Sequence, residues 1–487
     1  MMIWVRPDPG NPHIGYTLAA AAWMAIWWIS EAVPLAVTSL LPVVLFPTLG
    51  IMDGATVSST YFNHVIFLFI GGFMVAMAMQ KWNLHRRIAL NILALTGTSP
   101  QRILLGFMLA SAFLSMWISN TATAMMMVPI ALSVISELKQ DMRAKGQKKS
   151  DIAILLGIAY GCSIGGIMTL VGTPPNLSLA RIFQIMFPQA PEIGFAQWMM
   201  MAMPVGITML LIAWGLLILI FGLRRNSNDN WNTGQIRELR QQLGPMSRAE
   251  FMIMTIFLSM AFLWISRSPI QLGDFTIPGW SLLFKNANFL NDGTVAIALS
   301  IPLFMLRVTQ SEKSIPLLDW ETAVKLPWGI VLLFGGGFAL ASGFSSSGLA
   351  LWMGEHLKGI STLPLPLIIL SVSLFITFLT ELTSNTATTE MILPVLAGLS
   401  VSIGVHPLIL MIPATLSASM AFMLPVATPP NAIIFGSGQI RVAEMVRAGI
   451  WLNLAGAVVI TLAVYLLAGL VFGFDPSVLP EWGMTKS

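Results

Sequence analysis

The chain has 487 residues, of which 56% are hydrophobic and only 9% are charged. Soluble domains contain about 25% charged residues, so this composition excludes an ordinary soluble domain. The formal net charge of +4 does not indicate nucleic-acid binding, because the basic residues stand at the ends of apolar stretches. The single cysteine, Cys162, excludes an intramolecular disulfide and a cysteine-based metal cluster.

Apolar stretches of bilayer-spanning length follow one another from residue 14 to residue 472. The predicted spans are 14–29, 36–52, 62–80, 152–180, 199–222, 250–266, 293–307, 327–341, 407–440 and 448–472. The first apolar run leads straight into more membrane, so no cleavable signal peptide is expected. This pattern predicts an all-α polytopic membrane protein.

Two segments, 81–97 and 345–360, combine polar or basic residues with an apolar face. Such a pattern is typical of helices that lie in the membrane interface. For 81–97, an ordinary span that begins with basic residues remains the alternative. The polar, basic stretch 224–248 is expected to contain a short amphipathic helix.

Residues 103–136 form an apolar run that would reach about 50 Å as one helix, too long for one span and short for two. Basic residues stand at both of its ends, Arg102 before it and five in 139–149 after it, which places both ends on the inner side. A re-entrant hairpin with Ser119-Asn120-Thr121 near its tip satisfies both observations. Residues 363–404 form a second apolar pair around a polar centre.

The positive-inside rule tests this layout. With the N-terminus cytoplasmic and hairpins counted as returning, 20 of the 25 basic residues fall on the inner side. They are Arg6, Lys81, Arg86, Arg87, Arg102, the five in 139–149, Arg224, Arg225, Arg237, Arg240, Arg248, Arg307, Lys313, Lys325, Arg441 and Arg447. The other five are Arg181, Arg267, Lys285, Lys358 and Lys486. The split predicts about eleven spans plus two hairpins in the inner (plasma) membrane, with the C-terminus outside.

An internal repeat is the strongest signal in the sequence. Ser119-Asn120-Thr121 recurs as Ser384-Asn385-Thr386 at an offset of 265, and Gly71-Gly72 recurs as Gly336-Gly337 at the same offset. Thr173-Pro174-Pro175-Asn176 recurs at 428–431. By the predicted layout one hairpin opens inward and the other outward. That is an inverted repeat, the signature of a secondary transporter with a midplane site.

The repeat divides the chain into four parts. We expect scaffold spans in 1–61, a first inverted repeat in 62–246, scaffold spans and a linker in 247–326, and a second inverted repeat in 327–487. The first repeat contains the interfacial segment 81–97, the hairpin 103–136 and the broken helix 152–180; the second contains 345–360, 363–404, the broken helix 407–440 and the last span 448–472.

The two Thr-Pro-Pro-Asn motifs predict breaks in membrane helices, because proline lacks a donor and disfavours α geometry before it. Carbonyls freed upstream suit a cation, and the helix restarting near Pro175 presents N–H groups that suit an anion. A simple kink is the alternative for one such motif alone. No Lys or Arg lies in either hairpin tip or break, so a bound anion would depend on bound cations such as Na⁺.

Two acidic residues within the predicted membrane segments, and the lack of known catalytic motifs, bear on the function. Glu381 and Glu390 lie in the second hairpin, and intramembrane carboxylates are functional candidates. Glu381 either tunes a cation site, pairs with a basic residue or faces water. With one Cys, five scattered His and no HExxH or GxSxG motif, the chain is not expected to be an enzyme.

Paired Ser-Asn-Thr motifs, each followed by a Thr-Pro-Pro break, resemble the divalent anion/sodium symporter family of dicarboxylate, citrate and sulfate carriers. The resemblance covers nearly the whole chain. It implies a homodimer embedded in membrane lipid, with scaffold and transport domains in each protomer and an elevator mechanism. Segments 81–97 and 345–360 would be the interfacial arms along which the transport domain slides.

The resemblance also implies site residues. It places one Na⁺ near Ser115, Ser119, Asn120 and the Gly172 backbone. It places a second near Thr380, Ser384, Asn385 and the Ala427 backbone. The substrate carboxylates would meet Asn120, Thr121, Asn385 and Thr386, with Thr173, Pro174, Thr428 and Pro429 lining the pocket.

The function expected from the resemblance is Na⁺-coupled symport of C4-dicarboxylates such as succinate, malate and fumarate. Both Ser-Asn-Thr motifs are intact, which favours a sodium symporter. A sodium-independent dicarboxylate exchanger, and a Na⁺-coupled citrate or sulfate carrier of the same fold, are the alternatives.

Overall fold

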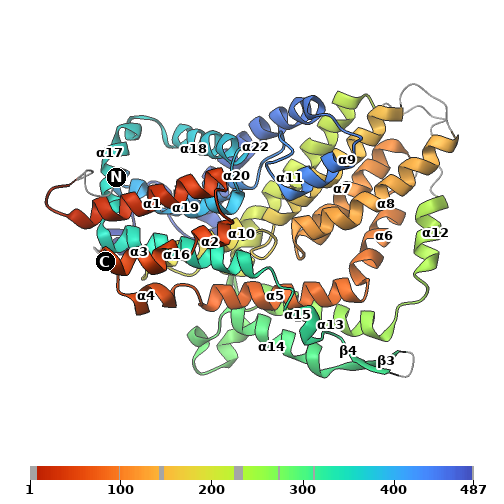
Figure 1. Ribbon diagram of the computed structural model, residues 1–487, viewed down its shortest axis with the longest axis horizontal. Coiled ribbons are helices and arrows are strands. Elements are labelled where there is room, and N and C mark those ends of the chain that lie inside the picture. The colour runs from red at the N-terminus through yellow and green to blue at the C-terminus, as the bar shows by residue number, and fades with distance from the viewer. Residues whose placement is uncertain are drawn as a thin grey trace.

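The structure is a computed structural model that describes residues 8–97, 99–141, 147–223, 234–272, 275–310 and 313–484. Six of the basic residues that were used to test the positive-inside rule lie outside these ranges: Arg6, Arg143, Lys145, Arg224, Arg225 and Lys486. The described residues form an elongated bundle of helices (Figure 1).

The N-terminal part holds four helices: α1 (Pro12–Ser30), α2 (Leu35–Thr38), α3 (Leu41–Thr48) and α4 (Gly54–Ser59). The predicted run 36–52 is thus two short helices rather than one. Pro42 occupies the first turn of α3 and Pro47 lies within it, while Pro34 stands just before α2. Prolines are tolerated at a helix start but interrupt its interior hydrogen bonds, which explains the division.

The first repeat holds α5 (His64–Lys81), α6 (Leu84–Thr96), α7 (Pro100–Ser115), α8 (Asn120–Asp141), α9 (Gln147–Ile167), α10 (Pro174–Met186) and α11 (Phe195–Phe221). The same segment also contains α12 (Gly234–Gln242), and the middle part holds α13 (Arg248–Ile265), α14 (Asp292–Met305) and α15 (Trp320–Ala323). The helix α12 is the short amphipathic helix expected in 224–248.

The second repeat holds α16 (Trp328–Ser347), α17 (Leu349–Leu357), η3 (Lys358–Thr362), α18 (Leu365–Thr380), α19 (Asn385–Ile403), α20 (Leu408–Ala418), α21 (Pro429–Gly436), α22 (Val442–Phe472) and α23 (Glu481–Met484). Each element of the first repeat from α5 to α11 therefore has a counterpart from α16 to α22. Both predicted hairpins are helix–turn–helix units, α7–α8 and α18–α19, and both predicted broken helices are present, α9–α10 and α20–α21.

Two short β-hairpins were not predicted. Strand β1 (Ile270–Leu272) pairs with β2 (Phe275–Ile277), and β3 (Arg307–Gln310) pairs with β4 (Lys313–Pro316), both antiparallel. The segment between β2 and α14 adds two 3₁₀ turns, η1 (Trp280–Leu283) and η2 (Ala287–Phe289). These elements occupy the loops around α13 and α14, where the sequence has no long apolar run to indicate structure.

Seven helices in the described ranges are long and apolar enough to cross a membrane: Gly54–Lys81, Lys149–Ile167, Phe195–Phe221, Arg248–Ile265, Trp328–Ser347, Asn385–Ile403 and Val442–Phe472. The described ranges also contain shorter apolar helices, which include both arms of the first hairpin. Large apolar side chains on their outer faces are exposed, for example Leu219 at 78% and Leu470 at 81%. In water such surfaces would be unfavourable, so they indicate contact with lipid. The chain is a polytopic all-α membrane protein.

The two ends of the described chain lie on the same side of the bundle, as the N and C marks show (Figure 1). Asn11 Nδ2 donates to the carbonyl of Ser347 at 2.9 Å, and Met484 lines a small cavity with Phe344 and Gly348. Both ends therefore meet the corner between α16 and α17. The predicted layout instead separates the two ends by the membrane, and the side on which each end lies stays a prediction.

Packing between α5 and α14 depends on small residues. A Cβ atom built on Gly71 would lie 2.6 Å from the Ala296 backbone carbon. Real Cβ atoms do not approach other atoms this closely, so glycine is required there. The predicted Gly-Gly motif of the first repeat is thus a helix-packing motif.

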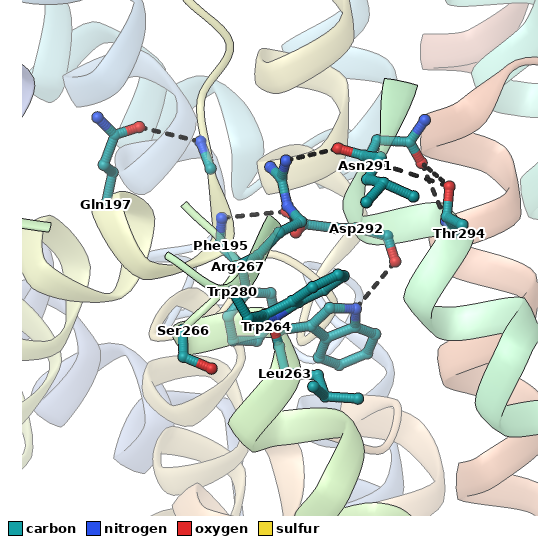
Figure 2. A network of polar contacts seen from close by, with 12 residues as sticks. Phe195, Gln197, Leu263, Trp264, Ser266, Arg267, Trp280, Asn291, Asp292 and Thr294 are labelled. Carbon is teal, nitrogen blue, oxygen red and sulfur yellow. Dashed lines mark hydrogen bonds and ion pairs between the residues drawn. The ribbon is translucent and has the colours of Figure 1, made fainter. Parts of the chain in front are cut away.

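A buried polar network joins the outer ends of α11, α13 and α14 (Figure 2). Arg267 Nε lies 2.5 Å from Asp292 Oδ1, and Arg267 Nη1 donates to the carbonyl of Leu290 at 2.8 Å. Asp292 Oδ2 accepts from the backbone N–H of Phe195 at 3.2 Å. The indole of Trp264 donates to the Asp292 carbonyl at 2.9 Å and stacks on the Phe195 ring. One ion pair therefore fixes three helix ends at once.

Candidate functional site

The first hairpin turns at its polar tripeptide. Helix α7 ends at Ser115 and α8 begins at Asn120, so the turn holds residues 116–119. Ser115 is buried, and its Oγ donates to Asn120 Oδ1 at 2.5 Å. Ser119 Oγ accepts from the backbone N–H of Ala122 at 3.2 Å, which caps the new helix. The tip thus presents the amide of Asn120 and the hydroxyl of Thr121 at a helix start.

The second hairpin repeats this geometry. Helix α18 ends at Thr380 and α19 begins at Asn385. Thr380 Oγ1 lies 2.7 Å from Asn385 Oδ1 and 2.8 Å from the Ala418 carbonyl. The hydroxyl–amide pair Thr380–Asn385 therefore matches the pair Ser115–Asn120 at the offset of 265 found in the sequence.

Both helix breaks adopt the conformation that their prolines impose. Thr173 has φ −146° and ψ 143°, and Thr428 has φ −142° and ψ 150°, so both are extended. Pro174 and Pro429 are the first residues of α10 and α21, where the missing N–H is not needed. Thr428 Oγ1 also accepts from the backbone N–H of Asn431 at 3.3 Å. The predicted restart of each helix at its Pro-Pro pair is confirmed.

The asparagine of each motif has a role that the sequence did not reveal. Asn176 Nδ2 donates to the carbonyls of Thr169 at 2.6 Å and Gly166 at 3.2 Å. These carbonyls lie beside the break, where the helix no longer supplies N–H partners. Asn176 is fully buried, so its side chain replaces backbone donors that water cannot supply. The only sequence signal was the motif itself.

The backbones that would hold cations lie against the hairpin tips. A Cβ built on Gly172 would lie 3.0 Å from the carbonyl oxygen of Ser115, and one built on Gly166 would lie 2.7 Å from Asn120 Oδ1. The first tip and the first break are thus in direct contact. Glycine at both positions lets the backbones approach.

A cavity of about 810 Å³ joins the two repeats. Both hairpin tips and both breaks line it: Ser119, Asn120, Thr121, Gly172, Thr173, Pro174, Ser384, Asn385, Thr386, Ala427, Thr428 and Pro429. Ser115 and Thr380 lie buried beneath the tips and support the two asparagines. All the residues that the sequence analysis placed in the site are therefore brought together.

The remaining lining includes residues of α1, α5 and α16 and apolar residues beside the tips and breaks. Phe69 and Phe73 of α5, Leu333 of α16 and the α1 end from Trp28 to Glu31 complete the wall. Among the described residues that line the cavity, none is Lys, Arg or His, and Glu31 is the one charged residue. Glu31 has a left-handed backbone with φ 48° and is exposed. An anion in this cavity would find neutral donors and helix N-termini only.

The surroundings of Glu381 exclude two of the three roles that the sequence left open for it. It is 3% exposed and accepts from the backbone N–H groups of Phe422, Met423 and Leu424 at 2.7, 2.9 and 3.0 Å. Asn453 Nδ2 of α22 donates to it as well, at 2.7 Å. Glu381 thus neither faces water nor pairs with a basic residue among those described. It holds the segment of the second break in place.

Comparison with known proteins agrees with this fold. Two solved structures share the fold over 93% of this chain: MtrF of Neisseria gonorrhoeae, with TM-score 0.58 and 12% identity over 95% of its length, and the YdaH transporter of Alcanivorax borkumensis, with TM-score 0.55 and 13% identity over 98%. The arrangement of helices in this chain is therefore a fold already known in polytopic membrane proteins.

The sequence comparison is more specific. The family described as the sodium:sulfate symporter transmembrane region matches residues 1–473, and the chain belongs to this family. The predicted family resemblance is confirmed. Relatives named sodium-dependent dicarboxylate transporter SdcS occur in Staphylococcus saprophyticus, 44% identical over 97% of this chain and 90% of the relative, and in Staphylococcus aureus strain MRSA252, 46% identical over 94% and 87%.

Proposed function

We propose that the protein is a secondary transporter, not an enzyme, that carries C4-dicarboxylates such as succinate, malate and fumarate together with Na⁺. The observation that carries the proposal is the cavity between the repeats. It presents two Asn–Thr pairs and four helix starts, but no basic side chain among its described lining residues. Two carboxylates suit two matched pairs of neutral donors, and the missing positive charge suits co-transported cations.

The proposed Na⁺ sites lie where each tip meets its break. Ser115, Ser119 and Asn120 would supply side-chain oxygens to the first ion and Gly172 a backbone carbonyl; Thr380, Ser384, Asn385 and Ala427 would do the same for the second. The buried pairs Ser115–Asn120 and Thr380–Asn385 support this assignment, since each hydroxyl lies within hydrogen-bond distance of the amide oxygen beside it. Neutral oxygens of this kind are the ligands of Na⁺ in transporters with discontinuous helices.

The substrate would bind between the two ion sites. Asn120, Thr121, Asn385 and Thr386 would donate to its carboxylates, with Thr173, Pro174, Thr428 and Pro429 lining the pocket. A cation bound first raises the local positive field, and in a low-dielectric cavity this field decides whether a dianion can enter. The relatives' printed names, sodium-dependent dicarboxylate transporters, support this choice of ion and substrate.

We propose an orientation in the plasma membrane from the basic residues. Lys81, Arg87 and Lys325 lie at the bundle end that carries the start of α16, and that end would be cytoplasmic. Both chain ends would then lie outside. The cavity reaches Ser30 and Glu31 at the same end as the start of α16, so the described conformation would be open to the cytoplasm.

The proposed movement is an elevator in which the hairpins and broken helices slide as one body within a homodimer. The contacts that support it are those within this body: α7 packs along α9, and α18 packs along α20. The interfacial arms would be α6 and α17, as expected from segments 81–97 and 345–360.

Uptake of radiolabelled succinate into proteoliposomes tests the proposal. With an inward Na⁺ gradient we expect uptake that K⁺ cannot support, and that Asn120→Ala or Asn385→Ala abolishes. Asn286→Ala is the matched control, because Asn286 is exposed in a loop outside the cavity. Uptake that ignores Na⁺ but requires internal dicarboxylate would identify an exchanger instead. Uptake of citrate or sulfate in place of succinate would identify a different carrier within the family.

A further inference from the structure

Glu390 is a buried carboxyl group that the proposed transport site does not use. It lies in α19, five residues beyond Asn385, and has no exposed surface. Its side chain points to the junction at which α19 meets α10 and α16, since it contacts Ser178 of α10 and Gly337 of α16. The three helices belong to both repeats, so this junction joins them behind the cavity.

The two oxygens of Glu390 have different surroundings. Oε1 is hydrogen-bonded to Ser178 Oγ, and Oε2 has no hydrogen-bond partner among the described residues. A Cβ on Gly337 would overlap the carboxyl group, so glycine at this position leaves the space that Glu390 fills. Ser178 Oγ also lies 3.3 Å from the carbonyl of Pro174, which lines the cavity.

No positive charge compensates this carboxyl group within the described chain. Titratable groups on the elements around the junction are Arg181 of α10, His13 and Tyr16 of α1, Tyr61 beside α16, Glu355, His356 and Lys358 of α17–η3, and Glu381 after α18. None of them is joined to Glu390 by a hydrogen bond or ion pair in the part of the chain that the structure describes: Tyr61 donates to the Ser39 carbonyl, and Lys358 pairs with Glu355. An ionised carboxylate in such a place has lost water and gained no cation.

A neutral acid satisfies the geometry. Its proton would lie between Glu390 Oε1 and Ser178 Oγ, and the Ser178 hydroxyl would then donate to the Pro174 carbonyl. Both hydrogens thereby have acceptors. We propose that Glu390 is a proton-binding site, occupied by one proton in the conformation described and emptied into water when α16 separates from α10 and α19.

The binding site itself stands on this geometry, and only its emptying during turnover rests on the proposed transport function. The proton balance is simple: Glu390–COOH gives Glu390–COO⁻ and H⁺ to water when the junction opens, and the reverse on closing. Rising pH therefore opposes closing of the junction, and low pH favours it. Transport slows at alkaline pH if this closed junction is a stage of each cycle.

Infrared difference spectroscopy of the purified protein tests the proton directly. Wild type should show the C=O stretch of a buried protonated carboxyl group, and Glu390→Gln should lack it. Glu238→Gln, in exposed α12, is the matched control and should keep it. Ser178→Ala, which removes the hydrogen-bond partner, should shift the band and serves where Glu390→Gln does not fold. A band unchanged in both Glu390→Gln and Ser178→Ala would overturn the proposal.

Transport tests the coupling. Fumarate uptake driven by Na⁺ should be measured with equal pH on both sides, from about pH 6.5 to about pH 8.5, where fumarate remains a dianion. We expect wild type and Glu238→Gln to slow about threefold or more at the alkaline end, and Glu390→Gln to keep a nearly constant rate. A Glu390→Gln profile that matches wild type would overturn the coupling. Absence of transport in wild type would instead count against the proposed function, and the infrared result would still decide the proton site.

Discussion

Asn176 and Asn431, 255 residues apart, make the same hydrogen bonds. Each side-chain amide donates to the carbonyl seven residues upstream, Thr169 at 2.6 Å and Leu424 at 3.0 Å, and to the carbonyl ten residues upstream. The match extends the internal repeat from residue types to individual hydrogen bonds. It also shows how each of two membrane helices can be interrupted without leaving all its freed carbonyls unpaired.

Replacing either asparagine by alanine should therefore loosen the corresponding break. Each buried carbonyl that loses its donor costs about 1–3 kcal/mol of unfolding free energy. We expect Asn176→Ala and Asn431→Ala to lower the melting temperature in detergent and to weaken Na⁺-dependent uptake by similar factors. Asn286→Ala, at an exposed loop position, is the control. Equal melting temperatures for all three variants and wild type would show that the amides do not support the breaks.

Glu381 gives the second break a support that the first lacks. Its carboxylate accepts from three consecutive backbone N–H groups and from Asn453, whereas the corresponding residue of the first repeat is Met116. In the first repeat Thr169 Oγ1 instead donates to the Met116 carbonyl at 2.5 Å. The two repeats thus fix their breaks by different side chains.

Glu381→Gln should destabilise the protein, because a neutral amide accepts fewer and weaker hydrogen bonds from N–H groups than a carboxylate. We expect a loss of about 2 kcal/mol, the usual contribution of hydrogen bonds to a charged group. Thermal unfolding followed by tryptophan fluorescence measures it, with Glu238→Gln as the exposed control. If Glu381→Gln melted at the wild-type temperature, the carboxylate charge would not be needed at this position.

The sequence predicted the elements that recur or that follow local rules. The Ser-Asn-Thr tips and Thr-Pro-Pro breaks were found because proline and short polar residues act locally and appear twice. The partners of Glu381 and Glu390 were not predictable, since Asn453 and Ser178 are 72 and 212 residues away in the chain. The side on which each chain end lies also depends on tertiary contacts such as Asn11 with Ser347.

Helix packing predicts opposite effects for the same substitution at two glycines. Gly71→Ala should destabilise the protein by about 1–3 kcal/mol, because its methyl group would collide with the Ala296 backbone of α14. Gly215 of α11 has no atom within 4 Å of the position that an added methyl group would occupy, so Gly215→Ala should stabilise by about 0.5–1 kcal/mol through helix propensity. Melting temperatures of the two variants check both signs. A stabilised Gly71→Ala would mean that α5 and α14 can separate freely.

The Arg267–Asp292 pair of Figure 2 predicts a strong non-additivity. The two side chains are 10% and 7% exposed, and removing one partner of such a buried pair typically costs about 3–5 kcal/mol, since the other charge is left uncompensated. We expect Arg267→Met and Asp292→Asn each to lower the melting temperature strongly, and the double variant to lower it by much less than the sum. The exposed pair Lys358–Glu355, whose side chains are 56% and 59% exposed, is the matched control, because surface ion pairs contribute at most about 1 kcal/mol. Additive losses at Arg267 and Asp292 would mean that each residue is held by its backbone partners, Leu290 and Phe195, rather than by the other's charge.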